Sequence, residues 1–432
     1  MNVHAPSLNP TAVADEQAHA RYQRIRNRTE QLAQPLAIED YVVQSMTDVS
    51  PTKWHLAHVT WFFETFVLIP HLDGYEPLNP GYQYLFNSYY LGAGERHCRD
   101  QRGYISRPTV AEVYDYRRHV DEHVAVLLDR TEGQSDEVGR VLEIGLQHEQ
   151  QHQELLMTDI KHVLSVNPLR PVYQAWPTDT TDLGQEAAPL EWIRVEEGLY
   201  EVGARIGDGF SFDNETPRHR YFIDAFDLAD RPVTNGEFMS FIEDGGYTRG
   251  DLWLSEGWAV AQEREWSEPF YWEMKDGQWH SFTMAGMRPV DPAETAAHIS
   301  YFEADAYARW AGARLPSEHE WEVAAAGQAP EGNLSGQGRF HPTRAAASQD
   351  GFKQLFGDVW EWTRSQYSPY PGYQTLPGTL GEYNGKFMSN QFVLRGGSCV
   401  TPDDHIRATY RNFFPADAGW QFSGIRLARD LG

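Results

Sequence analysis

The sequence predicts two domains of different fold class, an N-terminal four-helix bundle followed by an irregular α+β domain. The first part of the chain carries long stretches in which apolar residues recur with helical periodicity. A stretch rich in Pro, Thr, Asp and Ala follows without periodicity, which is typical of a domain linker. Beyond it, glycine, tryptophan and short β-like runs dominate, with helical patterns at 235–243 and 299–312. We therefore place the helical domain at residues 1–170, the linker at 171–189 and the second domain at 190–432.

The composition is that of a globular, acidic protein. Its 432 residues suffice for two or three domains, and 41% hydrophobic residues can fill their cores. With 36 Lys and Arg against 62 Asp and Glu, the formal charge of -26 argues against nucleic acids and anionic membranes as partners. There is no apolar run of about 18 residues that could span a bilayer, and residues 1–18 lack a signal-peptide pattern. We expect a cytoplasmic protein that does not bind membranes.

Cysteine usage narrows the choice of metal ligands. Only Cys98 and Cys399 occur, far apart in the chain, so there is neither a disulfide framework nor a Cys-x-x-Cys metal site. This fits a reducing compartment. A bound metal must then be held by histidine and carboxylate side chains.

The four helices of the bundle follow from periodicity and end signals. The first covers residues 15–34 and stops at Pro35. The second begins after Ser50 and Pro51, a good N-cap and first-turn pair, and is so apolar up to Pro70 that it must lie in the core. The third covers residues 109–128, and the fourth ends near Pro168. Bundles of this kind commonly house metals between facing helices.

The fourth helix contains the sequence HEQQH at residues 148–152. His148 and His152 lie one helical turn apart and project from the same face, so both can bind one metal, whereas Glu149 points elsewhere. The spacing is also that of zinc proteases, in which the glutamate is a general base on zinc-bound water. A solvated polar helix face is the third interpretation.

A third histidine in the second helix favours a metal site. His58 lies in the first turns of that helix, next to the small residue Ala57, where its imidazole can point into the bundle. His55 is the competitor, three residues earlier on a nearby face. Either residue could instead be a core or capping histidine.

Motifs in both halves resemble known families. The second half resembles the formylglycine-generating-enzyme (sulfatase-modifying factor) domain, a variant of the C-type-lectin-like fold. The first half resembles a DinB-type bundle, through the Leu-Ala-His sequence ending at His58 and the HEQQH block. The matching segments of the second half, in order, are 214–219 (NETPRH), 231–238 (RPVTNGEF), 314–322 (RLPSEHEWE), 357–362 (GDVWEW), 394–398 (LRGGS) and 423–426 (SGIR).

The fusion of these two domains is similar to the ergothioneine-biosynthesis sulfoxide synthases (EgtB). Enzymes of that family use O₂ and a non-haem Fe(II) held by three histidines to join a thiol to the imidazole ring of hercynine, a trimethylated histidine. The resemblance implies that His58, His148 and His152 are the iron ligands, and it gives Glu149 a structural role. Three neutral imidazoles suit this chemistry, because they leave positions on Fe(II) open for O₂, thiolate and substrate.

The resemblance also implies a proton or electron donor near the bound oxygen. A tyrosine phenol suits that role, and Tyr89 and Tyr90 are the nearest candidates by motif position, with Tyr383 next. Packing of ordinary bundle aromatics is the alternative for Tyr89 and Tyr90.

Substrate contacts are implied on both domains. Gln151 of the metal helix is expected to reach the substrate, and Asn412 resembles a hercynine-binding position. Phe413 and Phe414 belong to the same loop, and Trp420 is expected to line the pocket, since a trimethylammonium group favours aromatic faces. An ordinary turn of the lectin-like fold is the alternative.

The thiol donor is predicted from charge. One branch of the family takes γ-glutamylcysteine and binds its extra charges through an Arg of the first domain and an Asp/Arg set on the C-terminal loop. Those positions fall here at residues 87–90 and at Phe413 and Phe414, and none of them is charged. A buried carboxylate without a cationic partner is costly, so cysteine is favoured, with γ-glutamylcysteine or a selenosugar as alternatives.

Functions of other classes remain as alternatives. A formylglycine-generating enzyme would need a pair of reactive cysteines in the second domain, where only Cys399 occurs. A DinB-type zinc hydrolase or thiol transferase would use His148, His152 and Glu149 without any need for the second domain. A non-catalytic binding protein would need no iron.

Overall fold

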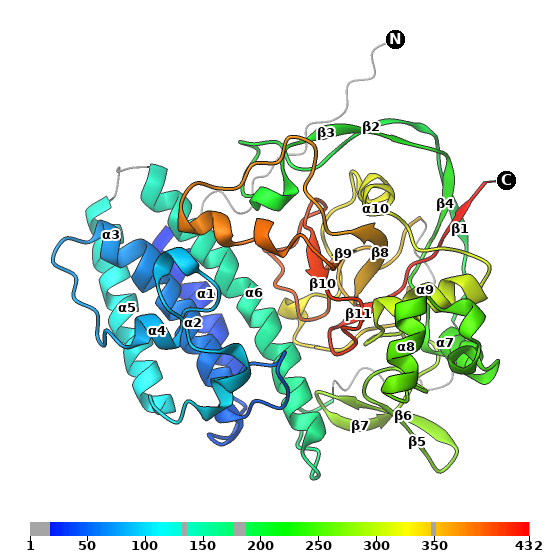
Figure 1. Cartoon of the computed structure of the whole chain (residues 1–432), viewed down its shortest axis with the longest axis horizontal. Coiled ribbons are helices and arrows are strands. Elements are labelled where there is room, and N and C mark those ends of the chain that lie inside the picture. Colours follow the sequence, from blue (N-terminus) through cyan, green and yellow to red (C-terminus); the bar gives the residue numbers. More distant parts are fainter. Residues whose placement is uncertain (1–17, 132–135, 177–186, 347–350, 432) are drawn as a thin grey trace.

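A computed structural model gives the structure of the protein and describes residues 18–131, 136–176, 187–346 and 351–431. Long helices gather on one side of the molecule, and short sheets with shorter helices form the other side (Figure 1). This confirms the predicted fold class, a helical bundle followed by an α+β domain. In the described ranges, no helix is long and apolar enough to cross a membrane.

Four long helices form the first domain in the part of the chain that the structure describes: α1 (Ala18–Ala33), α2 (Thr52–Phe63), α5 (Val110–Thr131) and α6 (Asp136–Val166). Helix α2 packs against α5 and α6, and α1 packs against α6. Every residue of α2 is buried, which confirms it as the core helix. It continues through a π-helical turn (Glu64–Leu68) into α3 (Ile69–His71), and α4 (Tyr82–Leu85) follows.

Helices α2 and α6 approach closely at Gly145. A Cβ atom on this residue would lie 2.5 Å from Cε1 of Phe63, nearer than real Cβ contacts allow. Because glycine has no Cβ, the two backbones can come together about one turn before His148. The close approach brings the histidines of α6 opposite His58 of α2.

The second domain is built from several small sheets. Among the described residues its strands are β1 (Trp192–Val195), β2 (Gly198–Val202), β3 (His219–Ile223), β4 (Phe226–Ala229), β5 (Trp272–Lys275), β6 (Gln278–Thr283), β7 (Gly286–Pro289), β8 (Trp360–Gln366), β9 (Phe392–Arg395), β10 (Asn412–Phe414), β11 (Ser423–Gly424) and β12 (Ala428–Asp430). The sheets have the orders β10-β9-β8-β11, β1-β4-β12, β5-β6-β7 and β2-β3. The first and last strands of this domain, β1 and β12, therefore lie on either side of β4 in one sheet.

Short helices lie beside these sheets: α7 (Asn235–Glu243), α8 (Ser255–Glu263), α9 (Tyr301–Trp310) and α10 (Glu318–Ala325). Helices α7 and α9 confirm the two helical patterns predicted in this half. Three of the helices begin with the same capping box, in which a hydroxyl and a glutamate three residues later satisfy each other's backbone N–H groups. The pairs are Thr234 with Glu237, Ser300 with Glu303, and Ser317 with Glu320.

Buried ion pairs join the motifs of the second domain to one another. Arg426 Nη2 lies 2.7 Å from Glu361 Oε1, and both side chains are fully buried. Arg395 pairs with Glu322 in the same way. Since a buried charge needs a partner, these residues tie distant segments into one core. The motifs that revealed the fold are thus mainly structural.

Helix α6 joins the two domains. The Glu154 carboxylate accepts hydrogen bonds from Trp360 Nε1 at 2.6 Å, from Ser398 Oγ at 2.8 Å and from Thr401 Oγ1 at 2.8 Å. Further along the helix, Lys161 Nζ lies 2.6 Å from His298 Nε2. These contacts hold the helix that carries His148 and His152 against the second domain.

The predicted linker starts in contact with both domains. The Tyr173 N–H donates to the Met284 carbonyl at 2.9 Å, and its hydroxyl donates to the Leu32 carbonyl at 2.8 Å. Residues 177–186 lie outside the described residues. The boundaries at 171 and 189 therefore stay predictions.

Candidate active site

Three histidines from two helices meet inside the first domain. His58 comes from α2, and His148 and His152 come from α6. One ring nitrogen from each lies within 4.8 Å of those of the others, and the Nε2 atoms of His58 and His148 are 3.2 Å apart. The sequence predicted these three residues, and the structure brings them together. Their spacing suits a single metal ion bound by imidazole nitrogens.

Hydrogen bonds fix which nitrogen of His58 faces the cluster. Its Nδ1 lies 2.6 Å from the Phe86 carbonyl, which can only accept, so Nδ1 carries the proton. The Nε2 lone pair is then free for a metal. A partner of this kind on the second nitrogen is what metal-binding histidines usually have.

His152 is oriented by a second histidine. Asp159 Oδ2 lies 2.9 Å from His55 Nε2, and His55 Nδ1 lies 2.9 Å from His152 Nδ1. Because the carboxylate can only accept, His55 Nε2 donates to Asp159, and His55 Nδ1 engages His152 Nδ1. His152 then presents Nε2 to the cluster. From the sequence alone, His55 is a rival ligand and Asp159 carries no signal, although both lie at helical spacing from predicted ligands.

Burial keeps the three imidazoles neutral. It lowers the pKa of His58 and of His152 well below the usual range, with the neighbouring histidines adding to the effect. It lowers the pKa of His148 to about 3. Neutral rings have lone pairs to donate, so the donor set fits a divalent transition metal such as Fe(II) or zinc.

Glu149 faces away from the histidines into a cationic pocket. Its carboxylate accepts from Arg26 Nη1 at 2.8 Å, Thr29 Oγ1 at 2.7 Å and Arg117 Nη2 at 3.1 Å. Burial would raise the pKa of this carboxyl, but the two guanidinium groups lower it to about 2. Such an anion is a poor general base, which speaks against the zinc-hydrolase interpretation.

Replacing Glu149 is expected to lower stability rather than to remove the metal site. A leucine would leave Arg26 and Arg117 buried with fewer anionic partners, so the free energy of unfolding should fall by about 3 kcal/mol. Urea unfolding of Glu149→Leu measures this, with the exposed Glu137→Leu on the same helix as the control. An unchanged midpoint would contradict the structural role.

The candidate tyrosines differ in their distance from the cluster. Tyr90 is buried against Trp61 and Phe66, at ring-centroid distances of 5.7 and 5.2 Å, and its hydroxyl lies 3.4 Å from that of Tyr89. Tyr383 of the second domain lies nearer, with its ring centroid 5.7 Å from that of His148 in an edge contact. Burial raises the pKa of Tyr383 well above its usual range, so its phenol stays protonated.

Gln151 connects the metal helix to the second domain. Its Oε1 accepts from the Tyr383 hydroxyl, and its Nε2 donates to the Tyr410 hydroxyl. Tyr383 and Tyr410 come from segments more than two hundred residues further along the chain. The contacts of Gln151 with these two tyrosines depend on how the second domain packs on helix α6, so the sequence alone does not predict them.

The predicted residues of the C-terminal loop are spread over two places. Asn412, Phe413 and Phe414 form β10, and the Phe413 ring stacks on Tyr367 with centroids 4.0 Å apart. Phe387 lies between Phe413 and Tyr89, at centroid distances of 6.0 and 5.0 Å. This aromatic row connects β10 with Tyr89.

Trp420 has no contact with the three histidines among the hydrogen bonds and ring contacts of the described residues. Its indole Nε1 is buried without a hydrogen-bond partner. The next aromatic residue, Phe422, packs on His298 at a centroid distance of 4.7 Å. Trp420 therefore lies on the side of the domain interface where Lys161 meets His298.

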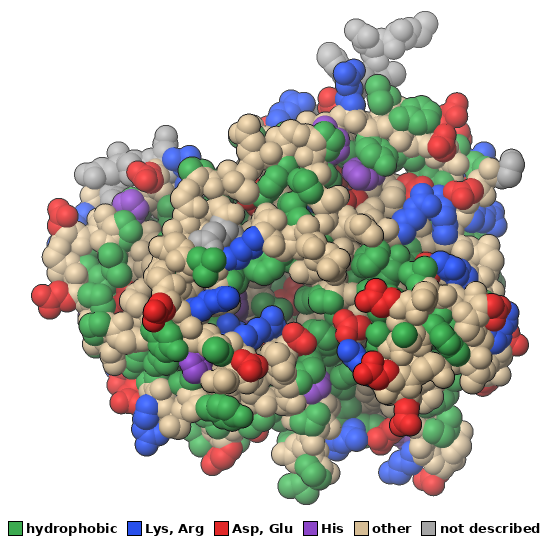
Figure 2. Space-filling view, in the orientation of Figure 1, with side chains coloured by type: hydrophobic (Ala, Val, Ile, Leu, Met, Phe, Trp, Pro, Cys, Tyr) green, Lys and Arg blue, Asp and Glu red, His purple; other side chains and the backbone are tan. Residues whose placement is uncertain are grey.

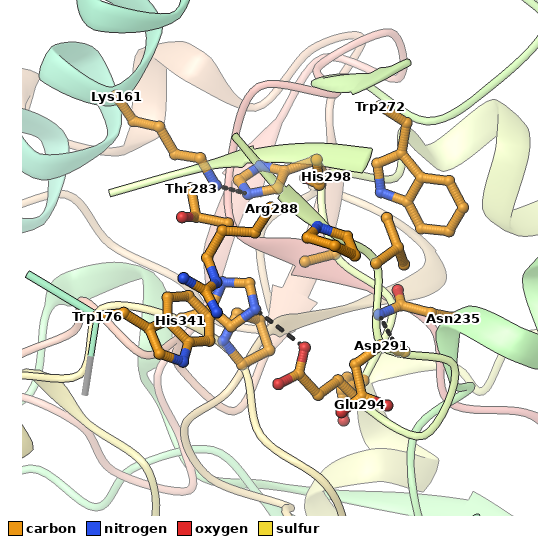
Figure 3. Close-up of a pocket in the computed structure, with 16 residues that line it drawn as sticks. Lys161, Trp176, Asn235, Trp272, Thr283, Arg288, Asp291, Glu294, His298 and His341 are labelled. Atoms are coloured by element: carbon orange, nitrogen blue, oxygen red, sulfur yellow. Dashed lines mark hydrogen bonds and ion pairs between the residues drawn. The ribbon is translucent and has the colours of Figure 1, made fainter. Parts of the chain in front are cut away.

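The cavity drawn in Figure 3 is at that other end of the interface. Lys161 of α6 points into it beside His298, and Arg288 lies over the Trp176 ring at 4.0 Å (Figure 3). None of the site residues predicted from the sequence lines it. This cavity is separate from the histidine cluster.

Basic side chains lie near the candidate site. Arg102 stacks on the Trp54 ring at 3.4 Å, and the Trp54 ring in turn stacks on His58 with ring centroids 4.5 Å apart. Arg102 donates to the hydroxyls of Ser50 and Ser88 and, within the described ranges, forms no ion pair. Figure 2 shows Lys and Arg side chains beside a hollow where the two domains meet.

Comparisons with known proteins agree with this architecture. Residues 21–156 match the DinB superfamily, and residues 180–431, more than half of the chain, match the sulfatase-modifying factor enzyme 1-like domain. A hercynine oxygenase of Mycolicibacterium thermoresistibile is 31% identical over 94% of this chain and 93% of its own. The chain belongs to the hercynine oxygenase family. This confirms the resemblance predicted from the HEQQH block and the six motifs.

Other relatives show which part of the chain is shared with which enzymes. A hercynine oxygenase of Mycobacterium tuberculosis is 31% identical over 89% of this chain and 92% of its own. A formylglycine-generating enzyme of Streptomyces coelicolor is 27% identical, covering 59% of this chain and 95% of its own. Only the hercynine oxygenases thus extend over both domains in these three comparisons.

Proposed function

We propose that the protein is a non-haem Fe(II), O₂-dependent sulfoxide synthase that joins cysteine to the imidazole ring of hercynine in ergothioneine biosynthesis. The observation that carries the proposal is the cluster of His58, His148 and His152 in a chain of the hercynine oxygenase family. We further propose that it acts in the cytoplasm on these small molecules. The formylglycine-generating activity is disfavoured, because the second domain has one cysteine, Cys399, which is buried and has a raised pKa.

The proposed iron ligands are the Nε2 atoms of the three histidines. Bound Fe(II) would supply O₂ activation and lower the pKa of a coordinated thiol. The chain itself contributes the orientation of His152 through His55 and Asp159, the orientation of His58 through Phe86, and a water-poor surrounding that keeps the imidazoles neutral. These features prepare the donor atoms before a metal arrives.

A tyrosine hydroxyl is the proposed proton donor. Tyr89 and Tyr90 remain the residues predicted from the sequence, and geometry supports Tyr383 more strongly because its ring touches His148 and its hydroxyl is oriented by Gln151. A protonated phenol held beside the metal ligands can donate its proton to a reacting oxygen once its O–H turns from Gln151 to that oxygen.

The remaining substrate contacts are proposed from their position. Gln151 lies beside Tyr383 on the metal helix, and Asn412, Phe413 and Phe414 lie on the strand that the aromatic row joins to Tyr89. Aromatic faces suit the trimethylammonium group of hercynine. Trp420 is proposed with them as the residue whose neighbour Phe422 packs on His298.

Cysteine is the proposed thiol donor, and the expected result is a preference over γ-glutamylcysteine. Phe413 and Phe414 offer no charge to the γ-glutamyl group, so its desolvation would cost about 1–3 kcal/mol per unpaired charged group. Since about 1.4 kcal/mol is a factor of ten, kcat/KM should favour cysteine at least about tenfold. Wild type, Phe414→Asp and the control Phe414→Leu are compared with both thiols at saturating hercynine.

Reconstitution tests the function as a whole. The protein is loaded anaerobically with Fe(II) or Zn(II) and given hercynine, O₂ and either cysteine, γ-glutamylcysteine or a selenosugar, and the products are identified by mass spectrometry. Sulfoxide formed only with Fe(II) and O₂ supports the proposal. Equal or better use of γ-glutamylcysteine would refute the specificity, and activity with Zn(II) alone would favour a hydrolase or thiol transferase.

A further inference from the structure

A chain of hydrogen bonds leaves helix α6, enters the second domain and returns to the same helix. Its members are Gln147, His405, Tyr410, Gln151 and Tyr383. His405 Nδ1 lies 2.6 Å from Gln147 Oε1, and His405 Nε2 lies 3.1 Å from the Tyr410 hydroxyl. The Tyr410 hydroxyl contacts Gln151 Nε2, and Gln151 Oε1 contacts the Tyr383 hydroxyl. Both His405 and Tyr410 are buried.

The direction of this chain is set at its far end. Gln147 Nε2 donates to Glu143 Oε1 at 2.8 Å, and a carboxylate can only accept. Gln147 therefore turns its carbonyl oxygen to His405, whose Nδ1 must carry the proton. Burial lowers the pKa of His405 well below its usual range, so the ring is neutral and its Nε2 is an acceptor.

The same logic fixes the amide of Gln151. The Tyr410 hydroxyl uses its one proton on His405 Nε2, so toward Gln151 it can only accept. If the amide were reversed, the Gln151 carbonyl oxygen would face the Tyr410 oxygen with no proton between them. The amide thus keeps Nε2 on Tyr410 and Oε1 on Tyr383, and the Tyr383 proton is directed to Gln151.

We propose that His405 and Tyr410 are positioning residues for the site. Neither contacts the three histidines among the described residues, yet together they orient the Gln151 amide and, through it, the Tyr383 hydroxyl beside His148. The proposal rests on the proposed function, since Gln151 and Tyr383 matter only if hercynine is converted here. It assigns a role in turnover to a buried histidine of the second domain that lies outside the group of His58, His148 and His152.

Two replacements of His405 separate orientation from packing. In His405→Gln the amide oxygen can take the place of Nε2 and accept from Tyr410, whereas in His405→Asn the amide nitrogen takes the place of Nδ1 and serves only Gln147. We expect His405→Gln to keep kcat/KM for hercynine within about threefold of the wild type and His405→Asn to lose about tenfold or more, as for one lost hydrogen bond. The loss should fall on kcat, with thiol oxidation rising against sulfoxide. Equal losses in both variants at equal melting temperature would overturn the proposal.

A double-mutant cycle tests the path through Gln151. His405→Asn should have little further effect in a Tyr383→Phe background, because no phenol remains to be oriented. Fully additive losses would overturn the proposal.

A measurement without turnover keeps this result distinct from the proposed function. In protein with ¹⁵N-labelled histidine, NMR should show a proton on His405 Nδ1 and none on Nε2, with the signal assigned by its loss in His405→Gln. The opposite tautomer would overturn the proposal even in an active enzyme. A wild type that forms no sulfoxide would refute the function while leaving the tautomer result standing.

Discussion

Alanine replacement of His148 is expected to abolish iron binding and sulfoxide formation. Replacing a residue that merely orients a ligand typically costs 10–100-fold in metal affinity, so losing the ligand itself should cost more than about 100-fold. The same result is expected for His58→Ala and His152→Ala, because all three ring nitrogens converge within 4.8 Å. Iron content after anaerobic reconstitution and product formation with hercynine and cysteine measure both effects.

Two further histidines provide the comparison. His55→Ala should weaken iron binding by about 10–100-fold yet still allow loading at high iron, since His55 orients His152 rather than facing the cluster. His162 lies on the same helix as two of the ligands, and its Nδ1 lies 2.7 Å from Ser45 Oγ. The variant His162→Ala should therefore leave the iron content unchanged. Normal iron binding by His58→Ala together with its loss in His55→Ala would show that the third ligand is wrongly assigned.

Replacing Tyr383 with phenylalanine is expected to slow sulfoxide formation by about 100-fold or more, the usual contribution of a positioned proton donor. The ring of Tyr383 would keep its edge contact with His148, so packing and iron binding should survive. Without the phenol hydroxyl, O₂ should oxidise the thiol instead, and the amount of sulfinate should rise relative to sulfoxide. Product ratios by mass spectrometry measure the change.

The Tyr89→Phe/Tyr90→Phe double variant is the matched test of the residues predicted from the sequence. If Tyr383 is the donor, this variant should keep its product ratio, because Tyr90 packs on Trp61 and Phe66 and its hydroxyl neighbour is Tyr89. A diverted product ratio in the double variant with an unchanged ratio in Tyr383→Phe would assign the role to Tyr89 and Tyr90.

Several features of this protein follow from the sequence alone. Helical spacing places His148 and His152 on one face and Glu149 on another, and the structure agrees because a single helix obeys its own period. The apolar second helix, the change of texture near residue 190 and the six motifs were sufficient for the fold class. These are local or near-local properties, set by neighbouring residues and by turn and capping chemistry.

Tertiary structure decided the rest. The choice between His55 and His58 depended on how α2 rotates against α6, since the two residues lie three positions apart on neighbouring faces. The approach of Tyr383 to His148, and the chain from Gln147 through His405 and Tyr410 to Gln151, join residues more than two hundred positions apart. No periodicity connects such residues. They meet because buried polar groups must find partners when the second domain docks on α6, and that requirement is met in space rather than along the chain.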